Sequence, residues 1–595
     1  MAFDLIIRGG TWFDGMGSPP AVRDIGVRDG RVVAVSASEL DADGCPEVLD
    51  AAGRWVTPGF VDIHTHYDAE LLGAPGLGES IRHGVTTVLV GSCSLGTVHV
   101  DAEDAADLFS RVEAVPHEHV LRLLQENRSW HDAASYVEAL ERLPLGPNVM
   151  SLLGHSDVRA AVMGLGRSTE DGVTPTEAEM RRMEELLVEA LDAGFAGLSE
   201  QRNPWDRLDG ERFRSRTLPS TYAGWKEYRR LHRILRDRDR VLQSIPNLTT
   251  PTAILPYLFE SMGRGRSRAL RTSFLTAADV KSNPLTRHIF GPLARFTNGV
   301  GGGDFRWQHV PAPFKVYADG IDLVVFEEFG AGAEALHLKD NAARRELMGS
   351  ADYRTRFRRD LENRWAPKVW NRRLDEVHIV DCPDPSVVGR TVAEVAETRP
   401  TDAIDTFLDL LIEHGPALRW WTVISNDRPG PLDELSALPE VQIGFADSGA
   451  HLRNMAFYNF GLYLLYRVRE RGFMPIERAV HRITGELADW FGVDAGRLRV
   501  GDRADIVVID PEGLDESVTE HHEAPMECFG GLTRMVNRND RAVTAVYVAG
   551  NRVFGDGAYT DVLGTRRTGR FLRAGEPAGQ VDPATVPAAG VTSGV

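Results

Sequence analysis

Eight short apolar segments alternate with helical stretches between residues 58 and 490, and this alternation constrains the fold more than any other feature of the chain. The helical stretches include residues 176–193 and 222–236. Short strands that alternate with helices are typical of a parallel sheet, and eight such units predict a closed (β/α)8 barrel of the TIM type. The predicted strands are 60–63, 86–90, 149–153, 195–198, 240–245, 273–277, 306–310 and 441–445.

The two ends of the chain show a different pattern, with short strands separated by tight turns. Residues 1–57 carry a turn signal at 28–30, and residues 491–560 carry another at 550–551. We expect both ends to form one small β-sandwich domain beside the barrel, which gives an α/β fold class overall. Two unrelated β modules are the alternative.

Two further segments depart from the barrel pattern. Residues 327–375 are rich in Arg, Glu and Ala and are too long for a loop, which predicts a helical insertion that acts as a lid. Residues 561–595 are rich in Gly, Ala, Pro and Thr, a composition typical of a flexible tail.

Composition limits the partners of the chain. With 595 residues the chain exceeds a single core, so we expect more than one folding unit. The formal net charge of -19 argues against nucleic acid and against anionic membranes, and no apolar run is long enough to span a bilayer. Four dispersed cysteines and an acid, Asp4, where a signal peptide needs bases predict a cytoplasmic protein. A small-molecule substrate is therefore the expected partner, and the sequence leaves a homo-oligomer open.

Two histidines, His64 and His66, end the first predicted strand. Residues i and i+2 of a strand point to the same face, so the two imidazoles project together. Two imidazoles that share a face can bind one metal ion. The alternative is a pair of polar residues in a loop that follows a strand.

Other strand ends carry side chains of the same chemistry. Active sites of parallel barrels gather at the carboxyl ends of the strands, so these residues are expected to lie near the histidine pair. An acid beside a metal can bind it and can take a proton from its water. Cys93 would be either a thiolate ligand or a small apolar residue, and Glu200 either a bridging ligand or a buried partner for an arginine. The candidates are Cys93 after the second strand, His155 after the third, Glu200 after the fourth and Asp447 after the eighth.

Several segments of the sequence match one known family together. They are 58–66 (Pro-Gly-Phe-Val-Asp-Ile-His-Thr-His), 83–88 (His-Gly-Val-Thr-Thr-Val), Cys93, Gly154 and His155 with Arg159, 194–199, Asp447 and 501–505 (Gly-Asp-Arg-Ala-Asp). On these residues the chain resembles the amidohydrolase superfamily and, within it, the D-aminoacylase branch of N-acyl-D-amino-acid deacylases. The resemblance implies a metal-bearing barrel with an appended β-sandwich, a late lid insertion, and hydrolysis of an amide by metal-activated water.

The chain departs from this family at two positions. Gln243 and Asp279 stand where the family places histidines after the fifth and sixth strands. Because neutral glutamine is a poor zinc ligand, we expect one zinc ion rather than two. Lys281 aligns with a family lysine near the substrate carboxylate, although a surface position is the alternative.

These residues suggest separate roles in metal binding, proton transfer and substrate binding. Zinc held by His64 and His66, with help from Cys93, would activate water, and Asp447 would move the proton to the leaving amine. His155 is expected to donate to the developing oxyanion. Arg159, Lys281 or Arg453 are the candidates to bind a carboxylate, with solvated ion pairs as the alternative for each arginine.

The expected activity is hydrolysis of the amide bond of an N-acyl amino acid, with N-acyl-D-amino acids as the expected class. Two alternatives stay open at this point. The chain would otherwise hydrolyse a cyclic amide or imide, since related sites serve many substrates. Alternatively, the replaced histidines would mark a depleted metal site that has lost hydrolysis.

Overall fold

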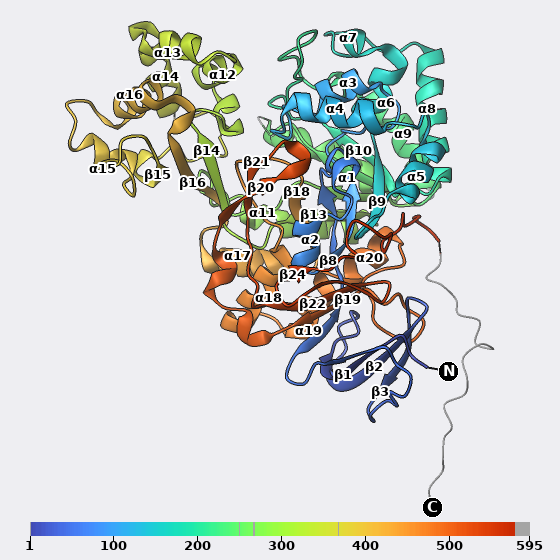
Figure 1. Cartoon of the computed structure of the whole chain (residues 1–595). Helices are drawn as coiled ribbons and strands as arrows, with labels where there is room; N and C mark the ends of the chain where they lie inside the picture. The colour runs from blue at the N-terminus through green and yellow to red at the C-terminus, as the bar shows by residue number, and fades with distance from the viewer. Residues whose placement is uncertain (1, 249, 266–267, 364, 367, 577–595) are drawn as a thin grey trace, which may run out of the picture.

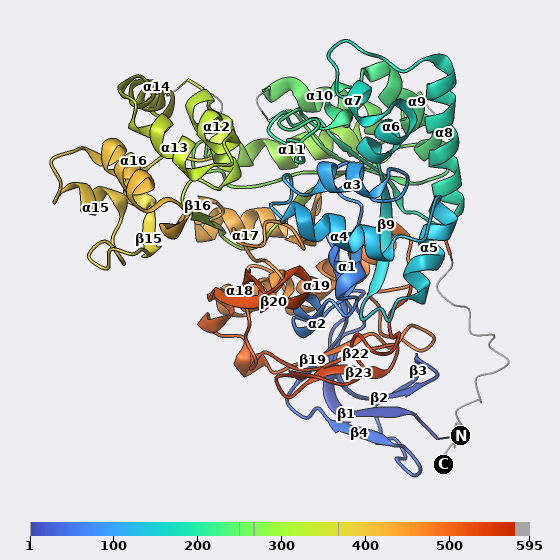
Figure 2. The same ribbon diagram turned by 45° about the horizontal axis from the view of Figure 1, so that its top comes forward.

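The computed structural model describes residues 2–248, 250–265, 268–363, 365–366 and 368–576. Figures 1 and 2 show a central α/β body, a sheet domain that contains the N-terminal strands, and a helical lobe that projects to one side of the body. Among the described residues, no helix combines the length and the apolar composition that crossing a bilayer requires.

The central body is a parallel barrel. One eight-stranded sheet runs from β6 to β17, and it closes because β7 (His64–Thr65) pairs in parallel with β18 (Phe445–Ser448). The Ile63 N–H also donates to the Gly444 carbonyl at 2.7 Å across this seam. Each predicted barrel strand overlaps one observed strand, so the predicted fold class is confirmed. In spatial order the sheet contains β6 (Phe60–Asp62), β8 (Val85–Val90), β9 (Asn148–Gly154), β10 (Gly197–Gln201), β11 (Val241–Ile245), β12 (Arg271–Phe274), β13 (Asp304–His309) and β17 (Val441–Ile443).

The helix α8 (Glu177–Asp192) illustrates why the intervening segments are helical. Thr176 caps its N-terminus by accepting a hydrogen bond from the Glu179 N–H, and the Glu179 side chain bonds back to the Thr176 N–H. Met180, Met183 and Leu187 follow at helical spacing and are buried against the body. The local signals and the burial pattern therefore agree on a helix that covers the barrel.

Strands from both ends of the chain form one nine-stranded sheet. Its main order is β24-β23-β22-β19-β5-β1-β2-β3, and β4 pairs with β1. The two halves meet where β19 lies antiparallel to β5, and their apolar residues share one core. The strands are β1 (Leu5–Trp12), β2 (Ala21–Arg28), β3 (Arg31–Ser36), β4 (Glu47–Asp50), β5 (Trp55–Pro58), β19 (Ile506–Ile509), β22 (Val543–Val548), β23 (Asn551–Gly555) and β24 (Ala558–Tyr559).

The Gly-Asp-Arg-Ala-Asp segment ties this sheet to the barrel. Arg503 donates to the Asn148 side-chain oxygen at 2.9 Å, and the Asn148 amide donates to Asp505 at 2.8 Å. Asn148 begins the barrel strand β9, and all three side chains are buried. The segment therefore has a structural role at the base of the barrel, away from the carboxyl ends of the strands.

The insertion is longer than the helical segment expected at 327–375. It begins at β14 (Phe314–Asp319) and ends at β16 (Arg419–Ser425), which pairs with β14 and with β15 (His378–Asp381). Its own apolar core includes Phe326, Trp370 and Trp420. Figure 2 shows this lobe beside the barrel. Its helices are α12 (Gly330–His337), α13 (Asn341–Gly349), α14 (Ala351–Glu362), α15 (Val392–Ala396) and α16 (Ala403–His414).

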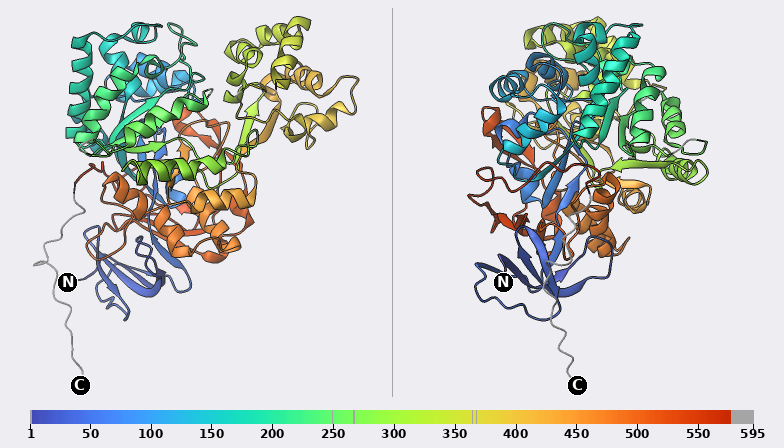
Figure 3. Two further views of the ribbon diagram at one scale, coloured as in Figure 1. Left: turned by 180° about the vertical axis from the view of Figure 1, so that it is seen from behind. Right: turned by 90° about the vertical axis from the view of Figure 1, so that its right-hand side faces the viewer.

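The predicted flexible tail needs a correction in its first part. Phe571 and Leu572 are buried, and the Leu572 N–H donates to the Val149 carbonyl at 2.8 Å. The described chain end thus packs on the body, which Figure 3 shows from behind and from the side. Composition misled because a few apolar residues suffice to anchor a polar segment. Residues 577–595 of the predicted tail lie outside the described residues.

Candidate metal centre

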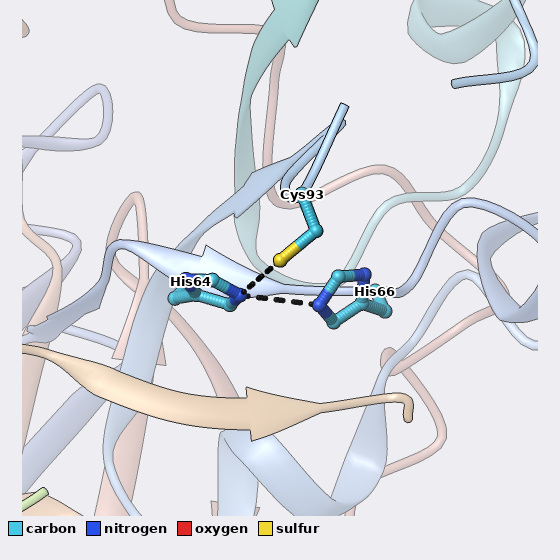
Figure 4. A group of neighbouring side chains, drawn as sticks. All are labelled: His64, His66 and Cys93. Atoms are coloured by element: carbon cyan, nitrogen blue, oxygen red, sulfur yellow. Dashed lines mark hydrogen bonds between the residues drawn. The ribbon is translucent and has the colours of Figure 1, made fainter. Parts of the chain in front are cut away.

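Four side-chain atoms converge at the seam where the barrel closes. The Nε2 atoms of His64 and His66 lie 3.2 Å apart, and the Cys93 Sγ lies 3.3 Å from the His64 Nε2. Figure 4 shows the three side chains pointing toward one another. From the last strand, the Asp447 Oδ1 lies 3.1 Å from the His66 Nε2 and 3.5 Å from the His64 Nε2. These four residues were expected to meet, and the structure brings them together.

The spacing of these atoms fits a tetrahedral zinc site. Zinc bonds of about 2.0–2.3 Å at tetrahedral angles put nitrogen and sulfur ligands about 3.3–3.6 Å apart. The four separations that involve the Nε2 atoms of His64 and His66, 3.1–3.5 Å, lie close to this range. Cys93 groups with the two histidines, and Asp447 groups with His66 and Glu113. Imidazole, thiolate and carboxylate are also the usual ligands of zinc, so the donor set fits the ion in chemistry as well as in size.

Partner side chains orient the two imidazoles. The His64 Nδ1 lies 2.7 Å from the Gln308 Oε1, so it donates to this amide oxygen and leaves Nε2 as an acceptor. The His66 Nδ1 lies 3.1 Å from a Glu113 oxygen, as an ion pair whose angle departs from ideal hydrogen-bond geometry. Metal-binding histidines commonly use the second ring nitrogen in this way, because it fixes the tautomer and the ring orientation.

Unusual backbone conformations hold two of the donors in place. Cys93 has φ 55° and Asp447 has φ 56°, in the left-handed region that few non-glycine residues adopt. The Cys93 N–H donates to the Gln243 Oε1 at 3.1 Å, and the next N–H, that of Ser94, donates to Ser199 at 2.9 Å. Strain of this kind clusters at functional sites, where the surrounding structure holds it.

Burial sets the protonation of the donors. It lowers the pKa of His64 to about 4, so this imidazole is neutral and ready to bind a cation. It raises the pKa of the Cys93 thiol to about 12 and that of Glu113 to about 8. Burial alone would also raise the pKa of Asp447, but His66 and His64 hold it well below its usual range. A bound cation would deprotonate the thiol, because a coordinating thiol ionises.

Two predicted site residues point elsewhere. Glu200, expected as a possible ligand, bonds to the buried His232 at 2.8 Å and is absent from the donor cluster. Glu200 is two residues from Leu198 and so shares its face of β10, toward the surrounding helices. His155, expected to stabilise an oxyanion, bonds to Ser220 at 3.0 Å and to Glu227 at 2.9 Å. Both ring nitrogens of His155 are thus occupied, and a position after a strand did not ensure that a side chain points into the barrel mouth.

The three cations expected to bind a carboxylate already have protein partners. Arg159 is fully buried and bonds to Glu227 at 3.1 Å. Lys281 pairs with Glu376 of the insertion and with Asp427 at 2.8 Å. Arg453 bonds to Asp319 at 2.9 Å and to Glu523 at 2.9 Å. Each of the three cations thus forms an ion pair with an acid that is distant in the sequence.

Gln243 and Asp279, at the two positions where the family has histidines, also bond to other protein groups. Gln243 supports the Cys93 loop, and its amide nitrogen lies 3.4 Å from the Ile63 carbonyl. Asp279 pairs with Arg428 and lies outside the donor clusters found among the described residues. Both side chains therefore already have protein partners.

Sequence reasoning missed Glu113, Gln308 and His451. Gln308 lies in the middle of the seventh predicted strand, 306–310, and one residue before the end of β13, so a search of strand ends alone does not reach it. Glu113 lies after helix α3 (Ala102–Phe109) in a segment without a strand pattern, and no local signal marks it. The His451 Nε2 lies 4.0 Å from the Asp447 Oδ2, and the left-handed φ of 48° at His451 is visible only in the structure.

A cavity of about 230 Å³ borders this centre. Its wall includes His451 and the residues on both sides of Glu113, so it opens beside the donors. Barrel loops form one side, and residues 322–344 at the start of the insertion form the other. Four arginines line the cavity, namely Arg111, Arg207, Arg214 and Arg344.

The barrel and its cluster of histidine, cysteine and aspartate donors have the chemistry of a metal-dependent hydrolase. Residues 47–222 match the model of the amidohydrolase family. An uncharacterized protein of Mycobacterium tuberculosis strain H37Rv is 54% identical, over 97% of this chain and 96% of that protein. The N-acyl-D-aspartate deacylase of Alcaligenes xylosoxydans xylosoxydans is 27% identical, over 96% of this chain and 95% of the relative.

The fold agrees with these sequence relationships. A crystal structure of D-aminoacylase superposes with a TM-score of 0.61 at 23% identity, over 96% of this chain and 100% of that one. The chain belongs to the amidohydrolase superfamily, in its D-aminoacylase-like branch.

Proposed function

We propose that this protein hydrolyses N-acyl-D-amino acids to a free amino acid and a carboxylic acid, with a single zinc ion held by His64, His66, Cys93 and Asp447. The carrying observation is the four-donor cluster beside a cavity at the carboxyl ends of the barrel strands. The full-length relatives named N-acyl-D-aspartate deacylase and D-aminoacylase support the substrate class. One ion is proposed because Gln243 and Asp279 have other partners.

Zinc bound by this donor set supplies Lewis acidity, which lowers the pKa of water toward about 7 and polarises a carbonyl oxygen. Asp447 accepts the proton that the attacking water loses and delivers it to the nitrogen of the departing amine. Its Oδ2 is on the side of His451, which lines the cavity, so both proton transfers occur where the substrate lies. Water is added across the amide bond, and acid and amine leave.

Arg207 is our candidate to bind the α-carboxylate of the substrate. Arg111, Arg214 and Arg344 each contact a carboxylate at 2.9 Å or less. Among the described residues, the nearest carboxylate to Arg207 is Glu327 at 3.9 Å, and the buried Nε of Arg207 has no hydrogen-bond partner. The Nη1 of Arg207 donates to the Ser215 carbonyl at 3.2 Å. Arg207 is thus the least compensated cation of the four in the cavity.

The test of the function compares substrates on protein of known metal content. Purified protein is assayed for amine release from N-acetyl-D-amino acids, from their L enantiomers, and for ring opening of a cyclic imide. We expect D selectivity and about one zinc per chain by mass spectrometry. Ring opening without amide hydrolysis would replace the proposed substrate, and two zinc ions at full occupancy would contradict the single-ion site.

The assignment of Arg207 has its own test. Arg207→Met should raise KM for N-acetyl-D-amino acids by about 10–100-fold, since a hydrogen bond to a charged group contributes about 1.5–3 kcal/mol. KM for the neutral amides of the same compounds should hardly change. Arg233→Met, on the exposed face of helix α9 (Trp225–Asp237), is the control. Equal effects on acids and amides would rule out a carboxylate contact.

A further inference from the structure

A second cavity, of about 160 Å³, lies where the insertion joins the body. Strands β14 and β16 of the insertion form one wall (Figure 1). Helix α18 (Phe460–Arg471), the residues before it and the segment that precedes β20 (His522–Met526) form the other. None of the four metal donors and none of the four arginines of the first cavity line it. It is therefore separate from the metal centre.

Most of its lining is apolar. Ala312, Trp421, Val423 and Phe457 are among its apolar lining residues. Cavities of about 150 Å³ with apolar walls admit a molecule of the size of benzene. The volume therefore suits a ligand with the bulk of one ring, and a long chain or a nucleotide is too large.

One cation in this wall has no acidic partner. The Lys315 Nζ lies 4.1 Å from the centre of the Trp421 ring and 5.1 Å from that of Tyr317. Among the described residues no carboxylate forms an ion pair with it, and burial, with no neighbouring acid to offset it, lowers its pKa. Lys281, by contrast, has two acidic partners, Glu376 and Asp427. A bound anion would stabilise the charge of an ammonium group that is partly buried without an acidic partner.

Two buried polar atoms in the same wall also have no hydrogen-bond partner within the part of the chain that the structure describes. They are the Nε2 of His521 and the Oδ1 of Asn537, and Asn537 is only 2% exposed. The amide oxygen of Asn537 can only accept, so it needs an N–H or O–H group. Buried polar atoms without partners are rare, and a ligand that carries a donor would satisfy this one.

We propose that this cavity binds a small organic carboxylate with an apolar body about one ring in size, its carboxylate on Lys315 and a hydroxyl or amino hydrogen on Asn537. Hydroxybenzoates are the simplest compounds of this class. A molecule bound here contacts β14 and β16 of the insertion and α18 of the body at once. It therefore links the insertion, which forms one side of the first cavity, to the barrel.

Isothermal titration calorimetry of the full-length protein with 4-hydroxybenzoate tests the proposal. We expect binding to the wild-type protein and at least about tenfold weaker binding to Lys315→Met, the loss expected for a charge-assisted hydrogen bond. Lys226→Met, which removes an exposed lysine on α9, should bind as the wild type does. Phenol, which lacks the carboxylate, should bind both proteins equally weakly. Absence of binding to the wild type at millimolar 4-hydroxybenzoate would overturn the proposal.

A second pair of variants locates the ligand. Ala456→Leu places extra bulk in the cavity wall and should abolish the binding heat. Asp447→Asn, in the metal centre, should leave the affinity for 4-hydroxybenzoate unchanged. Binding that is lost in Asp447→Asn but kept in Lys315→Met would place the ligand in the metal centre and refute the second site.

Discussion

At the scale of single residues, the Asp447 side chain meets two requirements, namely binding of a cation and exchange of a proton. Its Oδ1 lies among the candidate metal donors, whereas its Oδ2 lies 4.0 Å from the Nε2 of His451, a residue that lines the cavity. Its side chain is 12% exposed, whereas the imidazoles of His64 and His66 are 0% and 1% exposed. A carboxylate in this position can both hold a cation and exchange a proton with a substrate.

Replacement of Asp447 by asparagine keeps the shape and removes the ability to take a proton. We expect kcat to fall at least about 100-fold, the lower bound for loss of general-base help. Asp171→Asn, an exposed acid on the surface, should retain full activity. Circular dichroism and metal content of each variant show whether the fold and the ion persist. Near wild-type turnover by Asp447→Asn would mean that another group moves the proton.

Glu113 acts on the ion through His66. Because its carboxylate contacts the ring nitrogen opposite to the donor atom, Glu113→Gln should weaken zinc binding by about 10–100-fold, as mutations of such partners do. Competition with a chelator measures the affinity, and Glu118→Gln on the exposed face of helix α4 (His117–Asn127) is the matched control. Glu113→Asp should recover part of the affinity. Equal zinc affinity in Glu113→Gln and wild type would show that the Glu113 carboxylate does not support metal binding by His66.

The convergence of four side chains could be predicted from the sequence because a strand end is a local signal. His64, His66, Cys93 and Asp447 each follow an apolar strand, and strand period plus barrel topology brings them together. Glu113 was missed because its approach to His66 depends on the path of a long loop. The ion pairs of Lys281 with Glu376 and of Arg453 with Asp319 could not be predicted, because both acids belong to an insertion whose placement no local pattern reveals.

At the scale of elements, the pair His232 and Glu200 joins helix α9 to strand β10. Both side chains are fully buried, and His232 is also 3.7 Å from Glu260. Burial opposes protonation of His232, but the charge of Glu200 and its hydrogen bond more than offset burial and raise the pKa of His232 to about 9. The residue expected to bind metal thus stabilises the contact of a helix with the barrel wall.

This shift predicts a dependence of stability on pH. His232 binds its proton more tightly in the folded than in the unfolded chain, where the pKa is near 6.5, so the stabilisation is complete below pH 6.5 and is lost as pH rises through about 9. Between these two pH values the free energy of unfolding of the wild type should fall by on the order of 1–3 kcal/mol more than that of His232→Gln. Denaturant titrations from pH 6 to 10 measure it, with the exposed His131→Gln as control. Parallel curves for wild type and His232→Gln would show that the pair is not charged.

The insertion shows where element prediction fails. Its helices have periodic sequences and were recognised in part, but β14 and β16 pair across about a hundred residues of other structure, a separation that local pattern does not encode. The first strand of this lobe follows β13 directly, so the barrel pattern masks the boundary. The observed lobe is therefore an α/β unit with a core of its own rather than a helical segment.

At the scale of the whole molecule, the described end of the chain packs against the barrel. Phe571 is 1% exposed and contacts Phe195 and Val149. Phe571→Ala should destabilise the protein by about 3–5 kcal/mol, the usual cost of truncating a buried phenylalanine. Differential scanning calorimetry should show a lower Tm, whereas Leu285→Ala, at a side chain 75% exposed, should leave it unchanged. An unchanged Tm in Phe571→Ala would show that this segment is dispensable.

The sheet built from both ends of the chain has a consequence for synthesis on the ribosome. Strand β5 is the edge on which β19 pairs, and β19 begins about 450 residues after β5 ends, a delay of roughly 20–90 s at a translation rate of about 5–20 residues per second. During that interval the nascent chain carries an open sheet edge, which is a template for incorrect pairing. A chain arrested before residue 506 never closes this edge, so premature termination produces aggregation-prone fragments rather than a smaller folded enzyme.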